Sequence, residues 1–348
     1  SHFRHHTFQM TEVFKSTGYE PEAQIGQGSS AIVWAARHRK TSQKLAIKQI
    51  LSPFKTKESS KRSLLETKLM MYNAHENLMA AYDVIELENC GDIMIVMEQM
   101  DTDLGRIIDS KNNITSMQRQ LFVYQILRGL KYLHSANVIH RDIKPQNCLV
   151  NANCDLKISD FGSAIEIGSE EKGNCIEEEE ATTLWYRAPE ILLKSKRSSP
   201  AVDVWSVGCV FGELIAGKPI FKGTDSSEQI ALILDVVEIC GRKNSDPDVK
   251  ISQNCQDNYC KSRKLRDLVP ELSAVGFDLL CRMLTFDSEK RISVDEALRH
   301  PYFEDMHDSE DEPLAENLFK FPKVQSSQSS LQEFRSLFAK DHQLTNKQ

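Results

Sequence analysis

The segment that decides the fold is HRDIKPQN (140–147), and a long segment with helical periodicity lies on each side of it. The preceding segment, RQLFVYQILRGLKYLHSA (119–136), repeats its apolar residues at helical spacing. A later segment, DVWSVGCVFGELIAG (203–217), does the same, and we expect Gly217 to be its C-cap. The chain from Met117 onward is therefore predicted to be mainly helical.

The chain before Met97 has the opposite character. From Tyr19 to Met97, short apolar runs alternate with turn residues, which predicts strands. The exception is KESSKRSLLETKLMMY (57–72), whose apolar residues recur at helical spacing. The connector EQMDTD (98–103) follows. Because 348 residues exceed the usual size of one hydrophobic core, we predict an α+β fold with a strand-rich small lobe (19–97) and a helical large lobe (104–302).

Composition argues against several classes of function. The net charge of −7 does not favour nucleic-acid binding. No apolar run approaches the roughly 18 residues of a membrane span, and the N-terminal SHFRHHTFQM lacks the apolar core of a secretory signal. The nine cysteines form no C-x-x-C pair, which argues against zinc and for reduced thiols in the cytosol. Cys209 and Cys281 stand in apolar segments and are expected to pack in the core.

Two stretches among the predicted strands suit a phosphate group. In IGQGSSAIV (25–33), glycines would let a turn approach phosphate oxygens, although Ala31 replaces the third glycine of G-x-G-x-x-G and a plain hairpin explains the stretch equally well. The stretch AIK (46–48) follows on the next strand. Its Lys48 has a candidate partner in Glu66, and such a pair would hold the ammonium where phosphate oxygens must sit.

These stretches, in this order, resemble the protein kinases over roughly residues 19–302. HRDIKPQN matches the kinase catalytic loop at every defining position, and Asp160-Phe161-Gly162 follows thirteen residues after Asn147. The resemblance implies the bilobal kinase fold with an antiparallel small-lobe sheet. It implies that Asp142 accepts the proton of a substrate hydroxyl and that Lys144 offsets charge on the transferring phosphoryl group, with Lys48 and Glu66 completing the catalytic set. Asn147 and Asp160 would hold Mg²⁺ through oxygen atoms.

The same resemblance implies an ATP site at the small lobe and the hinge. Val33 and Ala46 would form the apolar roof over adenine, hinge backbone groups would bind its edge, and Asp103 would accept from a ribose hydroxyl. The predicted cofactor-binding residues are Ile25, Gly26, Gln27, Gly28, Ser29, Ser30, Ala31, Val33, Ala46, Lys48, Met97, Glu98, Met100 and Asp103.

Two further matches imply structural roles in the large lobe. Ala188-Pro189-Glu190 closes the activation segment, and Glu190 is expected to pair with Arg291. Asp203 is expected to secure the backbone of the catalytic loop.

Several stretches resemble one kinase family in particular. WYRAPE (185–190), GTDSSEQIALILDVVEICG (223–241) and HDSEDEP (307–313) are similar to the mitogen-activated protein kinases, and YQILRGLKYLHSANVIHRD (124–142) is similar to their stress-activated branch. The resemblance implies a monomeric Ser/Thr kinase of stress or immune signalling in the cytoplasm and nucleus. It also implies a preference for Pro after the phosphorylated residue, with Arg187 shaping that pocket.

The acidic patch Asp308, Glu310 and Asp311 is the implied docking site for partners. No Lys or Arg between 304 and 313 offsets these carboxylates, although a solvated acidic tail would look the same. The expected partners are substrates and regulators with basic and apolar docking motifs, including an upstream mitogen-activated protein kinase kinase.

The activation segment departs from the family pattern. Glu178-Glu179-Glu180 occupy the place of the family's phosphorylated Thr-x-Tyr, and no Tyr occurs between Phe161 and Trp185. A carboxylate carries less charge and fewer acceptor oxygens than a phosphate. The receptors are also depleted: Arg62, Arg141 and Arg187 match family arginines, whereas Leu65 and Leu184 replace two others.

Three explanations stay open at this point. Glu178 or Glu180 facing Arg141 and Arg187 would give constitutive low activity. Phosphorylation at Ser169, Thr182 or Thr183 would give a different activating site, although Thr183 fits better as part of the substrate groove. A weakly active or inactive docking scaffold would keep the fold alone, yet the intact catalytic set speaks against it.

The segments outside the kinase match are an N-terminal extension (1–18) and a tail (303–348). We expect QSSQSS (325–330) to be a low-complexity linker. In LQEFRSLF (331–338) apolar residues recur at helical spacing, which predicts a short helix docked on the small lobe.

Overall fold

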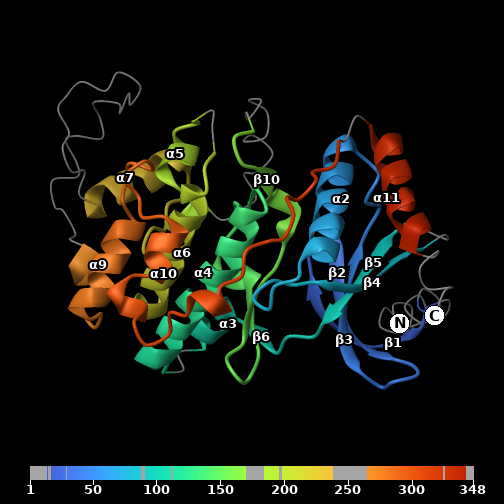
Figure 1. Cartoon of the computed structure of the whole chain (residues 1–348), viewed down its shortest axis with the longest axis horizontal. Helices are drawn as coiled ribbons and strands as arrows, with labels where there is room; N and C mark the ends of the chain where they lie inside the picture. Colours follow the sequence, from blue (N-terminus) through green and yellow to red (C-terminus); the bar gives the residue numbers. More distant parts are fainter. Residues whose placement is uncertain are drawn as a thin grey trace.

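Short apolar segments build a five-stranded sheet in the small lobe (Figure 1). The computed structural model describes residues 14, 17–28, 30–87, 91–110, 113–169, 184–195, 198–237, 265–323 and 326–341. Its first strands are β1 (Tyr19–Gln27), β2 (Ala31–His38), β3 (Lys44–Ile50), β4 (Ala81–Glu86) and β5 (Ile93–Glu98). They pair antiparallel in the order β1-β2-β3-β5-β4, as expected for the small lobe.

The two faces of this sheet carry different cores. Successive side chains of a strand point to opposite faces, so Leu45 and Ile47 join the outer cluster around Trp34, while Ala46 joins the main core beside the helix. Lys48 is two residues beyond Ala46 and pairs across the sheet with Ile95. The register therefore places Lys48 on the face that carries the helix.

The small-lobe helix, α2 (Lys57–Tyr72), has the bounds that the sequence predicts. Thr56 caps its N-terminus: the Thr56 side chain accepts the backbone N–H of Ser59. In return, the Ser59 side chain accepts the backbone N–H of Thr56. Leu65 and Leu69 on α2 are buried in the main core, and Glu66 lies on the same buried side.

The large lobe is mainly helical, which confirms the predicted α+β, bilobal fold (Figure 1). Its helices are α3 (Leu104–Asp109), α4 (Ser116–Ser135), α5 (Pro189–Leu192), α6 (Ala201–Ala216), α7 (Ser226–Val236), α8 (Leu265–Leu268), α9 (Ala274–Met283) and α10 (Val294–Leu298). Helices α4 and α6 contribute more buried residues than any other described helix of this lobe. Helix α6 ends at Gly217 in the left-handed conformation (φ 66°), the predicted C-cap.

Short strands hold the catalytic loop between the lobes. Strand β7 (Val138–Ile139) pairs with β10 (Ile165–Glu166), and β8 (Cys148–Val150) pairs with β6 (Thr102–Asp103) and β9 (Leu156–Ile158). The segment 140–147 thus leaves one strand and enters another. The hinge is shorter than the predicted 98–103, because β5 extends to Glu98 and β6 begins at Thr102.

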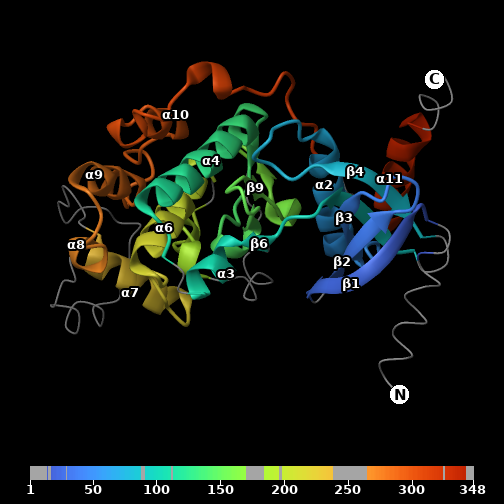
Figure 2. The same ribbon diagram turned by 90° about the horizontal axis from the view of Figure 1, so that it is seen from below.

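The tail returns from the large lobe to the small lobe (Figure 2). The N–H of Phe319 donates to Ala136 O at the end of α4 (2.9 Å), and the hydroxyl of Tyr72 on α2 donates to Asn317 O. The chain then forms α11 (Ser327–Asp341) against α2. Phe334 is fully buried with its ring beside Phe54 (centroids 5.6 Å apart).

The expected linker at 325–330 is wrong from Ser327 onward, since α11 begins there. The side chain of Ser326 accepts the N–H of Ser329 (3.1 Å), and a serine in this place favours a helix start over a flexible link.

The two cysteines expected to pack in the core have different environments. Cys209 is buried in α6, as expected, whereas Cys281 is exposed. Cys281 lies on the outward side of α9, because Leu279, Leu280 and Met283 fill its inward side. Among the described residues, no helix is long and apolar enough to cross a membrane.

Candidate active site

The catalytic loop places two polar side chains around one carboxylate. The Lys144 ammonium lies 2.7 Å from Asp142 Oδ2, and Asn147 Nδ2 donates to the same oxygen (2.9 Å) and to Asp142 O (2.8 Å). Asn147 uses its amide nitrogen for both bonds, so its Oδ1 can serve as a cation ligand. The loop therefore combines a fixed carboxylate with a neighbouring positive charge.

Asp203 binds the backbone of this loop, as the sequence predicts. It is fully buried on α6, and its carboxylate accepts the backbone N–H groups of His140 (2.9 Å) and Arg141 (2.8 Å) and a bond with His134 Nε2 (2.9 Å). Burial by itself would raise the pKa of Asp203, but the bond from His134 and the nearby imidazole rings hold the pKa below its usual range. The fixed charge stabilises Arg141 in its left-handed conformation (φ 69°).

His140 connects the catalytic loop to the segment that carries Asp160. Its Nδ1 accepts the N–H of Asp142 (3.2 Å), so Nε2 carries the proton and donates to Ser159 O (3.1 Å). The His140 ring packs edge-on against Phe161, which is fully buried. These contacts fix Asp160, which lies between Ser159 and Phe161.

Lys48 reaches both lobes through two carboxylates. Its ammonium forms an ion pair with Glu66 of α2 and lies 3.8 Å from Asp160 Oδ1. Burial would lower the pKa of Lys48, but the two carboxylates raise it above its ordinary value, so the ammonium stays charged. Burial also opposes ionisation of Asp160, yet Lys48, Lys144 and His140 lower its pKa. The structure thus brings together Lys48, Glu66 and Asp160.

The predicted nucleotide residues lie on the adjoining strands. Gly26 pairs with Val33, and the N–H of Gly28 donates to Ala31 O (2.8 Å), which closes the β1–β2 turn; Ser29 lies outside the described residues. Ala46 pairs with Met97 on the face toward α2.

At the hinge, the side chains of Glu98 and Asp103 bind other residues of this chain. The Glu98 carboxylate binds Asn151 (3.3 Å) and Lys157 (3.4 Å). The Asp103 carboxylate caps α3 by accepting the N–H of Arg106 (2.9 Å), and a ribose hydroxyl would have to share it.

A fork of hydrogen bonds anchors the end of the activation segment. Arg291 is inaccessible to solvent, and its Nη1 and Nη2 bind the two oxygens of Glu190 at 2.7 and 2.9 Å. It also donates to the carbonyls of Ala201 (2.7 Å) and Thr285 (2.9 Å). The predicted pair of Glu190 and Arg291 is confirmed.

A second anchor is Tyr186, whose hydroxyl donates to Glu213 Oε2 (2.6 Å). Burial raises the pKa of Glu213 to about 7. Since the native state then holds a proton that the unfolded chain releases near pH 4.5, the free energy of unfolding should fall as pH rises from about 4.5 to 7, by roughly 3 kcal/mol in total. Glu213→Gln should remove this part of the slope. Urea unfolding from pH 5 to 8 checks it, and parallel wild-type and variant curves would contradict it.

The predicted regulatory residues are only partly described. Glu178, Glu180, Thr182 and Thr183 lie outside the described residues. Arg62 is exposed on α2, and its Cβ is 4.0 Å from where a Cβ on Gly162 would lie, so it stands at the start of the activation segment. Arg141 and Arg187 are half-buried, and both make polar contacts.

The acidic docking patch is less free than the sequence predicts. Asp308, Glu310 and Asp311 are all exposed, but Asp311 lies 3.0 Å from Arg128 Nη2, and Arg128 also pairs with Glu76. Arg128 comes from α4, so counting charges near the patch in the sequence could not find it. The sequence count holds within 304–313, but Arg128 from outside that range compensates Asp311.

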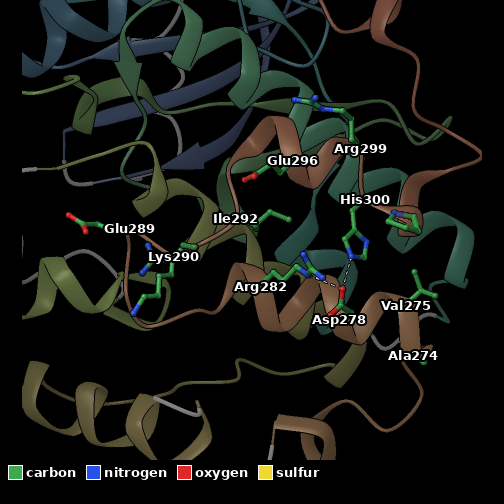
Figure 3. Close-up of a pocket in the computed structure, with 12 residues that line it drawn as sticks. Ala274, Val275, Asp278, Arg282, Glu289, Lys290, Ile292, Glu296, Arg299 and His300 are labelled. Carbon is green, nitrogen blue, oxygen red and sulfur yellow. Dashed lines mark hydrogen bonds and ion pairs between the residues drawn. The ribbon is translucent and has the colours of Figure 1, made fainter. Parts of the chain in front are cut away.

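Two cavities are lined by none of the predicted nucleotide residues. One of about 240 Å³ lies between the hinge, α4 and the β8–β9 turn, where Ile107, Ile114, Phe122 and Val150 give it apolar walls. The other, of about 750 Å³, lies between α9 and α10 (Figure 3). There Asp278 accepts bonds from Arg282 and His300. The second cavity carries charges of both signs, and no predicted site residue lines it.

Comparisons with known proteins agree with this geometry. The sequence model of the family described as "Protein kinase domain" matches residues 19–303. The chain is 41% identical over 330 residues to "Mitogen-activated protein kinase PMK1" of Pyricularia oryzae, which covers 91% of each chain. It is 42% identical over 315 residues to "Mitogen-activated protein kinase 13" of Arabidopsis thaliana, covering 88% of this chain and 85% of the relative. The chain therefore belongs to the mitogen-activated protein kinases and is a serine/threonine protein kinase.

Proposed function

We propose that this kinase phosphorylates Ser or Thr followed by Pro, and that its Glu-rich activation segment gives it basal activity before any upstream phosphorylation. The observation that carries the proposal is the ion pair of Lys48 and Glu66, with Asp160 3.8 Å from the same ammonium. Active protein kinases need this pair and the metal-binding Asp in place together.

The described residues support each step of phosphoryl transfer. Asp142 accepts the proton of the substrate hydroxyl as the oxygen attacks the γ-phosphorus and the bond to the ADP oxygen breaks. Lys144, 2.7 Å from Asp142, offsets the charge that the transferring group carries. Lys48 orients the α- and β-phosphates.

The residues present also fit Mg²⁺. Magnesium prefers oxygen ligands and keeps several waters, so few protein ligands are needed. Asp160 offers a carboxylate whose side chain is 47% exposed, and Asn147 keeps its Oδ1 for a cation. Bound there with ATP, the ion would neutralise charge on the phosphates.

Docking of basic partners is the second part of the proposal. Asp308 and Glu310 are exposed beside α4, and residues of α4 also line the apolar cavity of about 240 Å³. From Phe122 in the cavity wall to Arg128 at the patch, α4 rises about 9 Å. A short segment with basic residues and a nearby apolar side chain would fit both places.

One assay tests the proposal. Full-length protein from bacteria, shown by mass spectrometry to be unphosphorylated, is given Mg-ATP and a Ser-Pro peptide or its Ser-Ala counterpart. We expect turnover of the Ser-Pro peptide, faster by about tenfold or more than that of the Ser-Ala peptide, a difference of about 1.4 kcal/mol in barrier. The double variant Glu178→Ala/Glu180→Ala should lose most of this turnover, whereas Glu170→Ala/Glu171→Ala in the same stretch should not.

The alternatives give different results in the same assay. Turnover that appears only after addition of an upstream kinase would favour activation at Ser169, Thr182 or Thr183. Binding of a basic docking peptide without any turnover would favour the scaffold. A role in stress or immune signalling, a monomeric state and a place in cytoplasm and nucleus are proposed from the family resemblance, and imaging of a tagged chain under osmotic stress tests the localisation.

A further inference from the structure

A buried glutamine on α7 lies where the activation segment meets the large lobe. Gln229 is fully buried, and its Oε1 accepts the N–H of Gly223 (2.8 Å). Its Nε2 donates to the carbonyls of Trp185 (3.2 Å) and Phe221 (3.4 Å). One side chain thus bonds the backbone of two separate segments.

The position of Gln229 is itself fixed. Helix α7 begins at Asp225, whose carboxylate accepts the N–H groups of Ser227 (2.8 Å) and Glu228 (2.9 Å). Gly223 allows the close approach, because a Cβ there would lie 2.6 Å from the backbone nitrogen of Gln229. The loop at Gly223 therefore passes directly against the backbone of Gln229.

The ring of Trp185 also contacts the residues before α7, Lys222 and Gly223. Its Nε1 donates to Gly223 O (3.1 Å), and the Lys222 ammonium lies over the ring, 4.8 Å from the centroid. The next residue is also held at both ends: Ser206 Oγ donates to Tyr186 O (2.8 Å), and the Tyr186 hydroxyl donates to Glu213. Of these groups, Gln229 is the one that binds the backbone of Trp185.

We propose that Gln229 is a positioning residue for the protein substrate. By fixing the Trp185 carbonyl, it sets the path of segment 184–187, and the proposed function places the residue after the phosphorylated Ser or Thr against that segment. Gln229 does not touch the nucleotide residues. Its loss should therefore weaken binding of the protein substrate and leave binding of ATP unchanged.

The test compares two buried glutamines of the large lobe. Gln229→Leu leaves the Trp185 carbonyl and the Gly223 N–H without their partner. Gln125→Leu is the matched control: Gln125 is also buried, donates to Cys154 O (2.9 Å) and accepts the N–H of Leu156 (2.8 Å), but it bonds no atom of segment 184–187.

We expect Gln229→Leu to raise KM for a Ser-Pro peptide without a docking motif by about tenfold, as the loss of one or two net hydrogen bonds would do. Its KM for ATP should stay within about twofold of wild type, and Gln125→Leu should keep both constants within about twofold. An unchanged peptide KM in Gln229→Leu, or an equal rise in Gln125→Leu, would overturn the proposal. The wild-type ratio between Ser-Pro and Ser-Ala peptides reports on the proposed Pro preference separately.

A second variant covers failure of Gln229→Leu to fold. In Gln229→Glu, the protonated carboxyl can donate to the Trp185 carbonyl, whereas the ionised carboxylate repels it, and burial raises the pKa of such a group. Peptide KM of this variant relative to wild type should therefore rise from pH 6 to pH 8. A pH-independent ratio would reject the positioning role.

Discussion

Asp142→Ala should lower kcat for peptide phosphorylation by about 10²–10⁴-fold, which corresponds to roughly 3–5 kcal/mol of barrier. The substitution removes the acceptor for the substrate proton and also the shared partner of Lys144 and Asn147, both bound to Asp142 Oδ2. The side chain of Asp142 is 14% exposed and contributes no apolar contact to the core, so the variant should stay folded. Single-turnover phosphorylation of a Ser-Pro peptide measures the effect.

Two further variants make this result specific. Lys48→Met should be similarly impaired, because it leaves Glu66 without its ammonium partner on the nucleotide side of the sheet. Asp155→Ala is the matched control, since Asp155 is an exposed carboxylate in the β8–β9 turn that follows the catalytic loop. We expect it to keep kcat within about twofold of wild type. Turnover near the wild-type value in Asp142→Ala would contradict the assigned role of the base.

Arg291→Met should lower the free energy of unfolding by about 3–5 kcal/mol, the usual effect of removing one partner from a buried ion pair. The substitution would leave the charge of Glu190 and the carbonyls of Ala201 and Thr285 without their donors. Because domains are typically stable by only about 5–15 kcal/mol, much of the stability of the large lobe depends on this side chain. Urea unfolding followed by circular dichroism measures the change.

The neighbouring cavity supplies the control for this variant. Arg282 pairs with Asp278 at 2.9 Å, but both side chains are more than half exposed. Arg282→Met should therefore change stability by less than about 1 kcal/mol. If Arg291→Met were no more destabilising than Arg282→Met, the role of Arg291 as the anchor of Glu190 would be wrong.

Local patterns predict the parts of this molecule in which neighbouring residues determine the structure. The bounds of α2 follow from helical spacing after Thr56, and Gly217 ends α6 because it adopts the left-handed conformation. The contact between Asp203 and the catalytic loop is also foreseen, because its motif specifies both partners.

Contacts between distant segments escape such patterns. Arg128 contacts Asp311, which is 183 residues later in the sequence, and no residue near the acidic patch indicates this contact. Gln229 looks like an ordinary polar residue on α7, yet it is buried against Trp185. Residue spacing also misjudged Cys281, since an apolar segment does not reveal which side of a helix faces solvent.

The pairing of β3 with its neighbours limits which insertions the gene can tolerate. Gaining or losing one codon between Leu45 and Lys48 would turn the ammonium to the outer cluster around Trp34, although every strand could still find a partner. The sheet would survive while the phosphates lost their cation. Length changes should therefore accumulate in the exposed turn at 39–43 and be absent from the strand that follows it.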